Sequence, residues 1–141
     1  MHMNTMQRTV LGMGAALVLA VAAQAADKKP DLGKLPAAAA KAGLTFDKDV
    51  KPILEKSCFK CHSGDKPKGK YVIDNLAGAV KGGEAGAAVK PGKSAESPLL
   101  LFAADAVEEM EMPPTDKRDK FPALTKEQLA LVRAWIDQGA K

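Results

Sequence analysis

The sequence contains few of the residues that metal sites and nucleic-acid surfaces usually require. Its 141 residues include only two cysteines and two histidines, and aromatic residues make up 4% of the chain. A nucleic-acid surface usually combines a concentrated basic stripe with aromatic side chains. The net charge is only +4, so the composition does not favour nucleic-acid binding. No internal repeat is present, and the length suits one small domain with a tail.

The chain also lacks an apolar run long enough to span a membrane. The run at residues 9–23 is shorter than the roughly 20 residues that a spanning helix needs. It follows Arg8 and ends at Ala23-Gln24-Ala25, which is the arrangement of a secretory signal peptide with an A-x-A cleavage site. We therefore predict that residues 1–25 are cleaved and that the mature protein is periplasmic without a membrane span. An uncleaved membrane anchor is the alternative.

Residues 26–44 offer little large apolar surface to bury. They contain two prolines, glycines and a block of alanines. We expect a flexible N-terminal arm or linker here, with one short helix at residues 36–41. The domain itself is expected to cover residues 45–141.

Helical signals are clearest at the two ends of this domain. Before Cys58, apolar residues recur at the spacing of one helix face, and Pro52 requires that helix to begin close before it. Near the other end, Thr125 and Gln128 form a capping box, and Gly139 is the expected stop. We predict one helix at each of these places.

The middle of the domain is rich in turn-forming residues. Residues 71–80 are expected to hold an extended piece and a short helix, and another short helix is expected after the N-cap Ser97. The rest is expected to be loop, which is unusual in an ordinary core of this size. A bulky apolar group at the centre of the domain would explain this proportion of loop.

The two cysteines stand three positions apart, and a histidine follows at once, in Cys58-Phe59-Lys60-Cys61-His62. This C-x-x-C-H sequence has three interpretations: a dithiol redox couple, half of a zinc site, or the attachment site of a c-type haem. In the third, two thiols leaving a helix bond the two vinyl edges of one porphyrin, and the adjacent imidazole lies under the iron.

Counting argues against zinc, because a structural zinc site takes four ligands. The mature chain offers only Cys58, Cys61 and His62, since His2 is lost with the signal peptide. A thioredoxin-like pair is expected in a βαβ setting, and no strand pattern precedes the motif. The sequence therefore favours one covalent haem c, with Cys58 and Cys61 as attachment residues and His62 as an iron ligand.

The second axial ligand has to come from elsewhere in the chain. Without a second histidine, the candidates are the two methionines of E-E-M-E-M-P-P. We favour Met112, because Pro113 and Pro114 hold the following backbone extended, and keep Met110 as the alternative. If both make only apolar contacts, the iron is open or bound by lysine. His/Met ligation raises the reduction potential and suits electron transfer.

Other residues have candidate roles around this site. A carbonyl of the Pro91-Gly92 turn is the expected acceptor for the free N–H of His62. Trp135 is expected in the core, between the last helix and the first. The candidate donors to haem propionates are Tyr71, Lys68 and Lys70.

Lysines are dense around the cysteine motif, at Lys56, Lys60, Lys66, Lys68 and Lys70. They form either a solvated face or a docking rim for an acidic redox partner, which would raise the association rate at low salt. The overall charge decides little, because loss of the signal peptide removes only Arg8 and lowers the net charge from +4 to +3.

Several stretches together resemble the planctomycete-type monohaem cytochrome c domain, a class I-like cytochrome c family. Within residues 46–140 they read D-V-K-P-I-L, C-F-K-C-H, K-G-G, P-G-K-S-A-E-S-P-L, M-P-P and W-I-D-Q-G-A. The resemblance implies a small all-α fold with one covalent haem held by Cys58 and Cys61, with His62 as proximal ligand and Met112 as distal ligand. One departure is Tyr71-Val72-Ile73-Asp74 where the family has L-R-L-D, so an arginine that could meet a propionate is absent.

We therefore expect an exported c-type cytochrome that carries single electrons between redox partner proteins and is not an enzyme. Two other classes stay open: an enzyme or gas sensor with an open haem, and a haem-free thiol–disulfide oxidoreductase. Tight ligation by Met112 would argue against the first. The second predicts a colourless protein whose activity depends on Cys58 and Cys61 but not on Met112.

Overall fold

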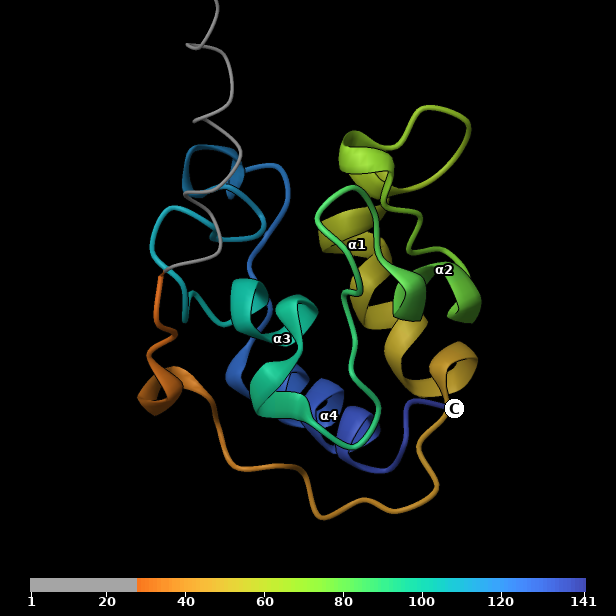
Figure 1. Ribbon diagram of the computed structural model, residues 1–141, viewed down its shortest axis with the longest axis vertical. Helices are drawn as coiled ribbons and strands as arrows, with labels where there is room; N and C mark the ends of the chain where they lie inside the picture. Colours follow the sequence, from red (N-terminus) through yellow and green to blue (C-terminus); the bar gives the residue numbers. More distant parts are fainter. Residues whose placement is uncertain (1–27) are drawn as a thin grey trace, which may run out of the picture.

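The structure, a computed structural model, describes residues 28–141, and the predicted signal peptide lies outside this part of the chain. Its regular structure is helical, and the only β-type pairing in the described residues is an isolated bridge between Gly83 and Gly86. This confirms the predicted all-α fold. The α-helices, drawn in Figure 1, are α1 (Lys51–His62), α2 (Leu76–Lys81), α3 (Pro98–Ala103) and α4 (Lys126–Asp137).

The predicted helix before Cys58 is present as α1, and it continues through both cysteines to His62. A π-helical turn, Phe46–Val50, leads into it. Pro52 lies in the first turn of α1, where its missing N–H has no helical partner to lose. Val50 and Leu54 are completely buried, so the beginning of α1 is held in the core while its end carries the cysteine motif.

Helix α4 forms as its capping signals predict. The backbone N–H of Gln128 donates to Thr125 Oγ1 at 3.2 Å, and the N–H of Thr125 donates to Gln128 Oε1 at 2.9 Å. The helix ends before Gly139, whose φ of 100° suits glycine. Trp135 is fully buried, with its ring 5.8 Å from that of Phe46, so it links α4 to the turn that precedes α1.

The short helices of the middle are also where the sequence places them. Asn75 caps α2, accepting from the N–H of Gly78 at 2.9 Å. Ser97 occupies the N-cap of α3, but its buried hydroxyl instead accepts from Lys90 N and donates to Lys93 O, both at 2.9 Å. Ser97 therefore ties the loop before α3 to the start of that helix.

The helix expected at residues 36–41 is wrong. The structure has a single 3-10 turn earlier in the arm, Leu32–Lys34, capped by the side chain of Asp31. Residues 36–41 instead lie alongside α4 in an irregular conformation, and Ala39 N donates to Ala130 O at 3.0 Å. Their backbone groups bond to α4, and this tertiary contact replaces a local helix.

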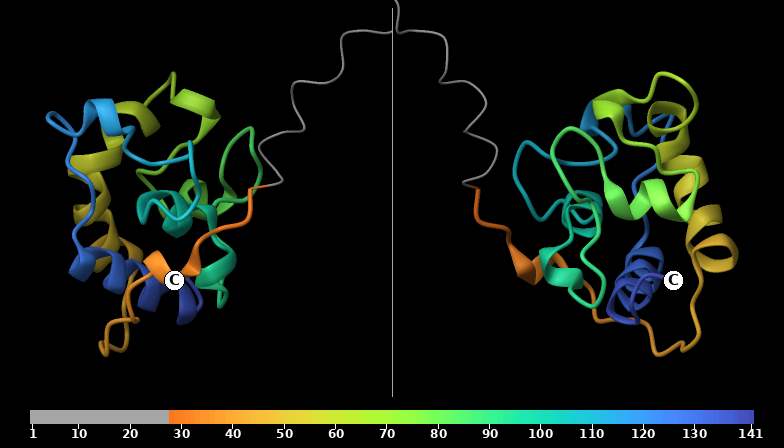
Figure 2. Two further views of the ribbon diagram at one scale, coloured as in Figure 1. Left: turned by 90° about the vertical axis from the view of Figure 1, so that its left-hand side faces the viewer. Right: turned by 45° about the vertical axis from the view of Figure 1, so that its right-hand side comes forward.

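The described part of the arm lies against the domain. It begins beside the segment at residues 106–111, passes α4 and reaches the π-helical turn before α1, as Figures 1 and 2 show. Asp31 N donates to Ala106 O at 2.7 Å, and Arg133 Nη1 donates to Pro36 O at 2.6 Å. The division into an arm at 26–44 and a domain at 45–141 stays a prediction, but residues 28–44 add contacts that their composition did not indicate.

None of the helices in residues 28–141 has both the length and the apolar character to cross a bilayer.

Candidate functional site

The two cysteines lie in the last turns of α1, three residues apart on neighbouring positions of the helix surface. Both are half-buried and neither is in a disulfide. Cys58 packs against the main hydrophobic core, while Cys61 lies nearer the helix end. The structure therefore presents two reduced thiols from one rigid helix, at the boundary between core and surface.

The surroundings of these thiols disfavour thiolate chemistry. Burial, with a smaller contribution from Cys61, raises the pKa of the Cys58 thiol to about 12. The carboxyl end of a helix also carries a partial negative charge, which opposes a nearby anion. Redox-active thiols have lowered pKa values and commonly lie at helix amino ends. A thioether is uncharged, so this environment suits cysteines bonded to carbon better than a dithiol redox couple.

His62 is the last residue of α1, and its ring is oriented by the loop that follows. Its Nδ1 lies 3.1 Å from the carbonyl oxygen of Lys68. Because a carbonyl oxygen only accepts, Nδ1 carries the hydrogen and Nε2 keeps its lone pair for a metal. Burial lowers the pKa of His62, which favours the neutral ring that a metal ligand needs.

The expected acceptor in the Pro91-Gly92 turn is wrong. That turn contacts the other end of the domain, where Gly92 N donates to Ile136 O at 2.7 Å. The loop after α1 folds back quickly enough to supply the acceptor locally, at Lys68. A backbone carbonyl has no side-chain signature, so the sequence carried no signal for this partner.

The K-G-G segment supports the turn that holds the Lys68 carbonyl. A Cβ at Gly83 would lie 2.2 Å from the carbonyl oxygen of Gly69, so only glycine allows this approach. Glu84 N donates to the same oxygen at 2.8 Å, and the Lys70 amine pairs with the Glu84 carboxylate at 3.0 Å. Gly83 and Glu84 thus position the turn that orients His62.

Tyr71 lies against the imidazole, with its ring centroid 5.4 Å from that of His62 and the rings tilted by 56°. Its hydroxyl donates to Ala79 O at 2.9 Å. Burial, with a smaller contribution from Cys58, raises the pKa of Tyr71, so the hydroxyl keeps its hydrogen at neutral pH. Because the hydroxyl hydrogen is already donated to Ala79 O, Tyr71 is better placed to support the His62 ring than to donate to a propionate.

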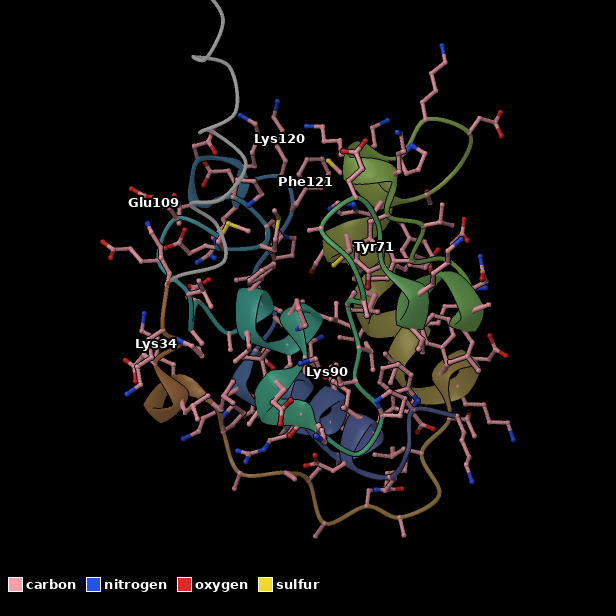
Figure 3. The ribbon with its side chains drawn as sticks, in the orientation of Figure 1. Lys34, Tyr71, Lys90, Glu109, Lys120 and Phe121 are labelled. Carbon is pink, nitrogen blue, oxygen red and sulfur yellow. The ribbon has the colours of Figure 1, made fainter. Side chains whose placement is uncertain are left out.

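The segment at residues 106–122 faces the end of α1. Ser57 Oγ donates to Pro122 O at 2.6 Å, which joins the segment to α1 beside Cys58. The pKa of Lys117 is raised first by Asp116 and then by Cys61, so its amine lies near that thiol. Figure 3 shows Lys120 and Phe121 beside the carboxyl end of α1, with Glu109 on the outer side of the segment.

The two candidate methionines have different surroundings. Met110 packs against the smaller core cluster formed by Leu101, Ala106 and Val107. Met112 is half-buried but belongs to neither core cluster of the described residues, and the same holds for Phe121. Met112 and Phe121 are therefore apolar side chains still available for a large apolar group.

The residues present fit a covalently attached haem. Two half-buried thiols and an imidazole with a free Nε2 lie at the end of one helix. The segment opposite them supplies the half-buried Met112 and Phe121. Such a set can hold a flat apolar cofactor covalently on one edge and ligate its metal from one face, with Met112 as the candidate for the other face.

Residues 58–116 match a family model described as Planctomycete cytochrome C. This confirms the resemblance found in the sequence motifs, and the match includes Cys58, Cys61, His62 and Met112. Searches of curated proteins and of solved structures found no match. The family match indicates haem-based electron transfer.

Proposed function

With residues 58–116 matching that family, we propose that this chain is an exported cytochrome that carries single electrons through one haem c. The observation that carries the proposal is the end of α1, where two half-buried thiols adjoin an imidazole with a free Nε2. When bound, the haem supplies a one-electron iron couple. The protein's residues hold it and set its surroundings.

Each residue has a separate role. Cys58 and Cys61 would attach the group covalently through thioether bonds, and His62 would offer Nε2 to the iron while the Lys68 carbonyl accepts from its Nδ1–H. Met112 offers a neutral thioether from the opposite segment. A nitrogen and a thioether ligand together favour a higher reduction potential than two nitrogens do.

This arrangement serves electron transfer without substrate chemistry. If His62 and Met112 both ligate the iron, small molecules would have no free position to bind, and little would have to rearrange when an electron moves. The surroundings of Cys58 argue against the alternative of a thiol–disulfide oxidoreductase, because that chemistry needs a thiolate. We therefore propose an electron carrier and not an enzyme.

Redox proteins with acidic surfaces are the partners that the charge distribution favours. Lys60, Lys66 and Lys68 are exposed at the end of α1 and in the loop after it. Lys68 also lies close enough to Asp116 to contribute to lowering the pKa of that carboxylate, after Lys117. These lysines surround the end of α1 that carries the cysteine motif, and they would attract an acidic partner at low salt.

The ligand assignment is tested by comparing methionine variants. The full-length chain is produced in a host with a haem-attachment system, and the ferric protein is examined for the near-infrared sulfur-to-iron absorption band. We expect the band in the parent and in Met110→Ala, and its loss in Met112→Ala, because only Met112 lies outside the core clusters.

Two results would contradict this assignment. Loss of the band in Met110→Ala alone would show that Met110 is the ligand. A parent protein without the band, whose ferrous form binds carbon monoxide readily, would support the open-haem enzyme or gas sensor instead.

A further inference from the structure

Arg118 connects both ends of the segment that carries Met112. Its guanidinium makes a two-pronged ion pair with Asp105, with Nη1 to Oδ2 at 2.9 Å and Nη2 to Oδ1 at 2.6 Å. Its Nε donates to Pro113 O at 3.1 Å. One side chain therefore holds Asp105, the second residue after α3, and Pro113, the residue just after Met112.

Asp105 is itself fixed by the surrounding chain. Its φ of 55° places it in the left-handed region, which aspartate tolerates better than most residues. Its backbone oxygen accepts a hydrogen bond from Lys34 Nζ at 2.6 Å, so the N-terminal arm fastens it from the other side. Arg118 is thus attached to an anchored carboxylate.

The backbone of Met112 is also tied to α3. Its N–H donates to Phe102 O at 3.0 Å, and the next residue, Pro113, is buried. Arg118 donates to the Pro113 carbonyl and to the Asp105 carboxylate, so it links these two residues. These contacts close a loop from residue 105 to residue 118 with Met112 on it.

We propose that Arg118 is a positioning residue that holds the Met112 thioether ready for ligation. The inference rests on the proposed function, since it takes Met112 as the axial ligand. A thioether is a neutral, weak ligand. The stability of its bond to iron therefore falls as the segment loses more conformational freedom when the bond forms. A segment already closed by Arg118 loses less than an open one.

Only arginine fits this geometry. The planar guanidinium presents several donors in a fixed fork, which serves a carboxylate and a carbonyl together. A lysine amine is a point charge and cannot reproduce the same three contacts. The Arg118 side chain is 25% exposed, so the ion pair is shielded more than a pair at the open surface.

The test measures how easily imidazole displaces the thioether in the ferric, haem-loaded full-length protein. Imidazole binds after the Met112 segment opens, so its apparent dissociation constant reports the closed-to-open equilibrium. The variants are Arg118→Gln, Arg118→Lys and Asp105→Asn. The control is Arg133→Gln, which removes a comparable half-buried arginine that contacts Pro36 in the arm.

We expect Arg118→Gln and Asp105→Asn to bind imidazole about tenfold more tightly than the parent, equivalent to ~1.4 kcal/mol. Arg118→Lys is expected to show a smaller increase in imidazole affinity than Arg118→Gln. Arg133→Gln is expected to bind imidazole as the parent does, even if its thermal stability falls. Hydrogen exchange at residues 106–117 should become faster in Arg118→Gln while exchange in α4 stays unchanged. If Arg118→Gln does not load haem, Asp105→Asn and Arg118→Lys decide the question.

Unchanged imidazole binding and unchanged hydrogen exchange in the Arg118 and Asp105 variants would overturn the proposal. An equal effect of Arg133→Gln would do the same, because it would show a general loss of stability. A parent protein without the sulfur-to-iron band would instead refute ligation by Met112, and with it the proposed function. The two failures are therefore distinguishable.

Discussion

At the scale of single residues, the structure separates attachment and ligation from support. The sequence identified Cys58, Cys61 and His62 because their spacing is a side-chain pattern. It did not identify the Lys68 carbonyl, since a backbone acceptor can come from any residue type. It also placed Tyr71 among the propionate donors, because the residue type alone does not show that its hydroxyl is already bonded to Ala79.

Tyr71→Phe distinguishes these two roles of the hydroxyl. Loss of the hydrogen bond to Ala79 O should lower the free energy of unfolding by ~1 kcal/mol. The reduction potential should stay unchanged, because the hydroxyl bonds to the protein backbone. Denaturant unfolding and a redox titration of the haem-loaded protein measure the two quantities. A shifted potential with unchanged stability would show that Tyr71 donates to the haem after all.

At the scale of elements, the helices with strong local signals were predictable. The capping box of α4 and the position of Pro52 in α1 depend on neighbouring residues, so the sequence states them directly. The helix expected at residues 36–41 failed because its backbone groups bond to α4, which lies far away in sequence. The sequence patterns also did not indicate that residues 83–84 pack on residues 69–71, since no periodicity links two loops.

Gly83→Ala tests the contact between those two loops. The added Cβ would lie 2.2 Å from Gly69 O and 2.9 Å from Tyr71 N, so the turn bearing the Lys68 carbonyl has to move. We expect the free energy of unfolding to fall by about 1–3 kcal/mol, as overpacking of a tight contact does. Thermal or denaturant unfolding of the haem-loaded protein provides the measurement.

The matched control for this variant is Gly33→Ala. A Cβ there meets only the Asp31 side chain, at 3.1 Å, and that side chain can move. Gly33→Ala should therefore lower the free energy of unfolding much less than Gly83→Ala does. Equal stability of Gly83→Ala and the parent would mean that the two loops do not constrain each other.

At the scale of the whole molecule, the arrangement around the site joins elements that sequence spacing cannot relate. The motif at the end of α1 and the Met112 segment come together through Ser57 and Pro122, and the segment is closed by Arg118 and Asp105. No pattern in the sequence pairs these residues. The position of Met112 before two prolines and the resemblance to a known family both favoured it, and the structure adds the contacts that surround it.

The lysines at the end of α1 give a prediction at this scale. Ferricyanide, an anionic one-electron oxidant, should oxidise the ferrous parent faster at low ionic strength than at high ionic strength. The double variant Lys60→Glu, Lys66→Glu should be slower by about tenfold at low ionic strength, with the difference disappearing as salt is added. Stopped-flow absorbance measures these rates.

Lys48→Glu is the control for charge alone. Lys48 is exposed in the turn before α1, at the opposite end of that helix from His62, and the helix of 12 residues is about 18 Å long. The oxidation rate of Lys48→Glu by ferricyanide should remain near that of the parent. An equal loss in Lys48→Glu would show that net charge matters and that no docking face exists at the end of α1.

The most direct test of the account is the intact mass of the purified protein, produced with a haem-attachment system and analysed under denaturing conditions. We predict the mass of the chain cleaved after Ala25 plus one haem, and loss of that added mass in the double variant Cys58→Ser, Cys61→Ser. A parent protein with the mass of the processed polypeptide alone would contradict covalent haem attachment, and with it the central claim.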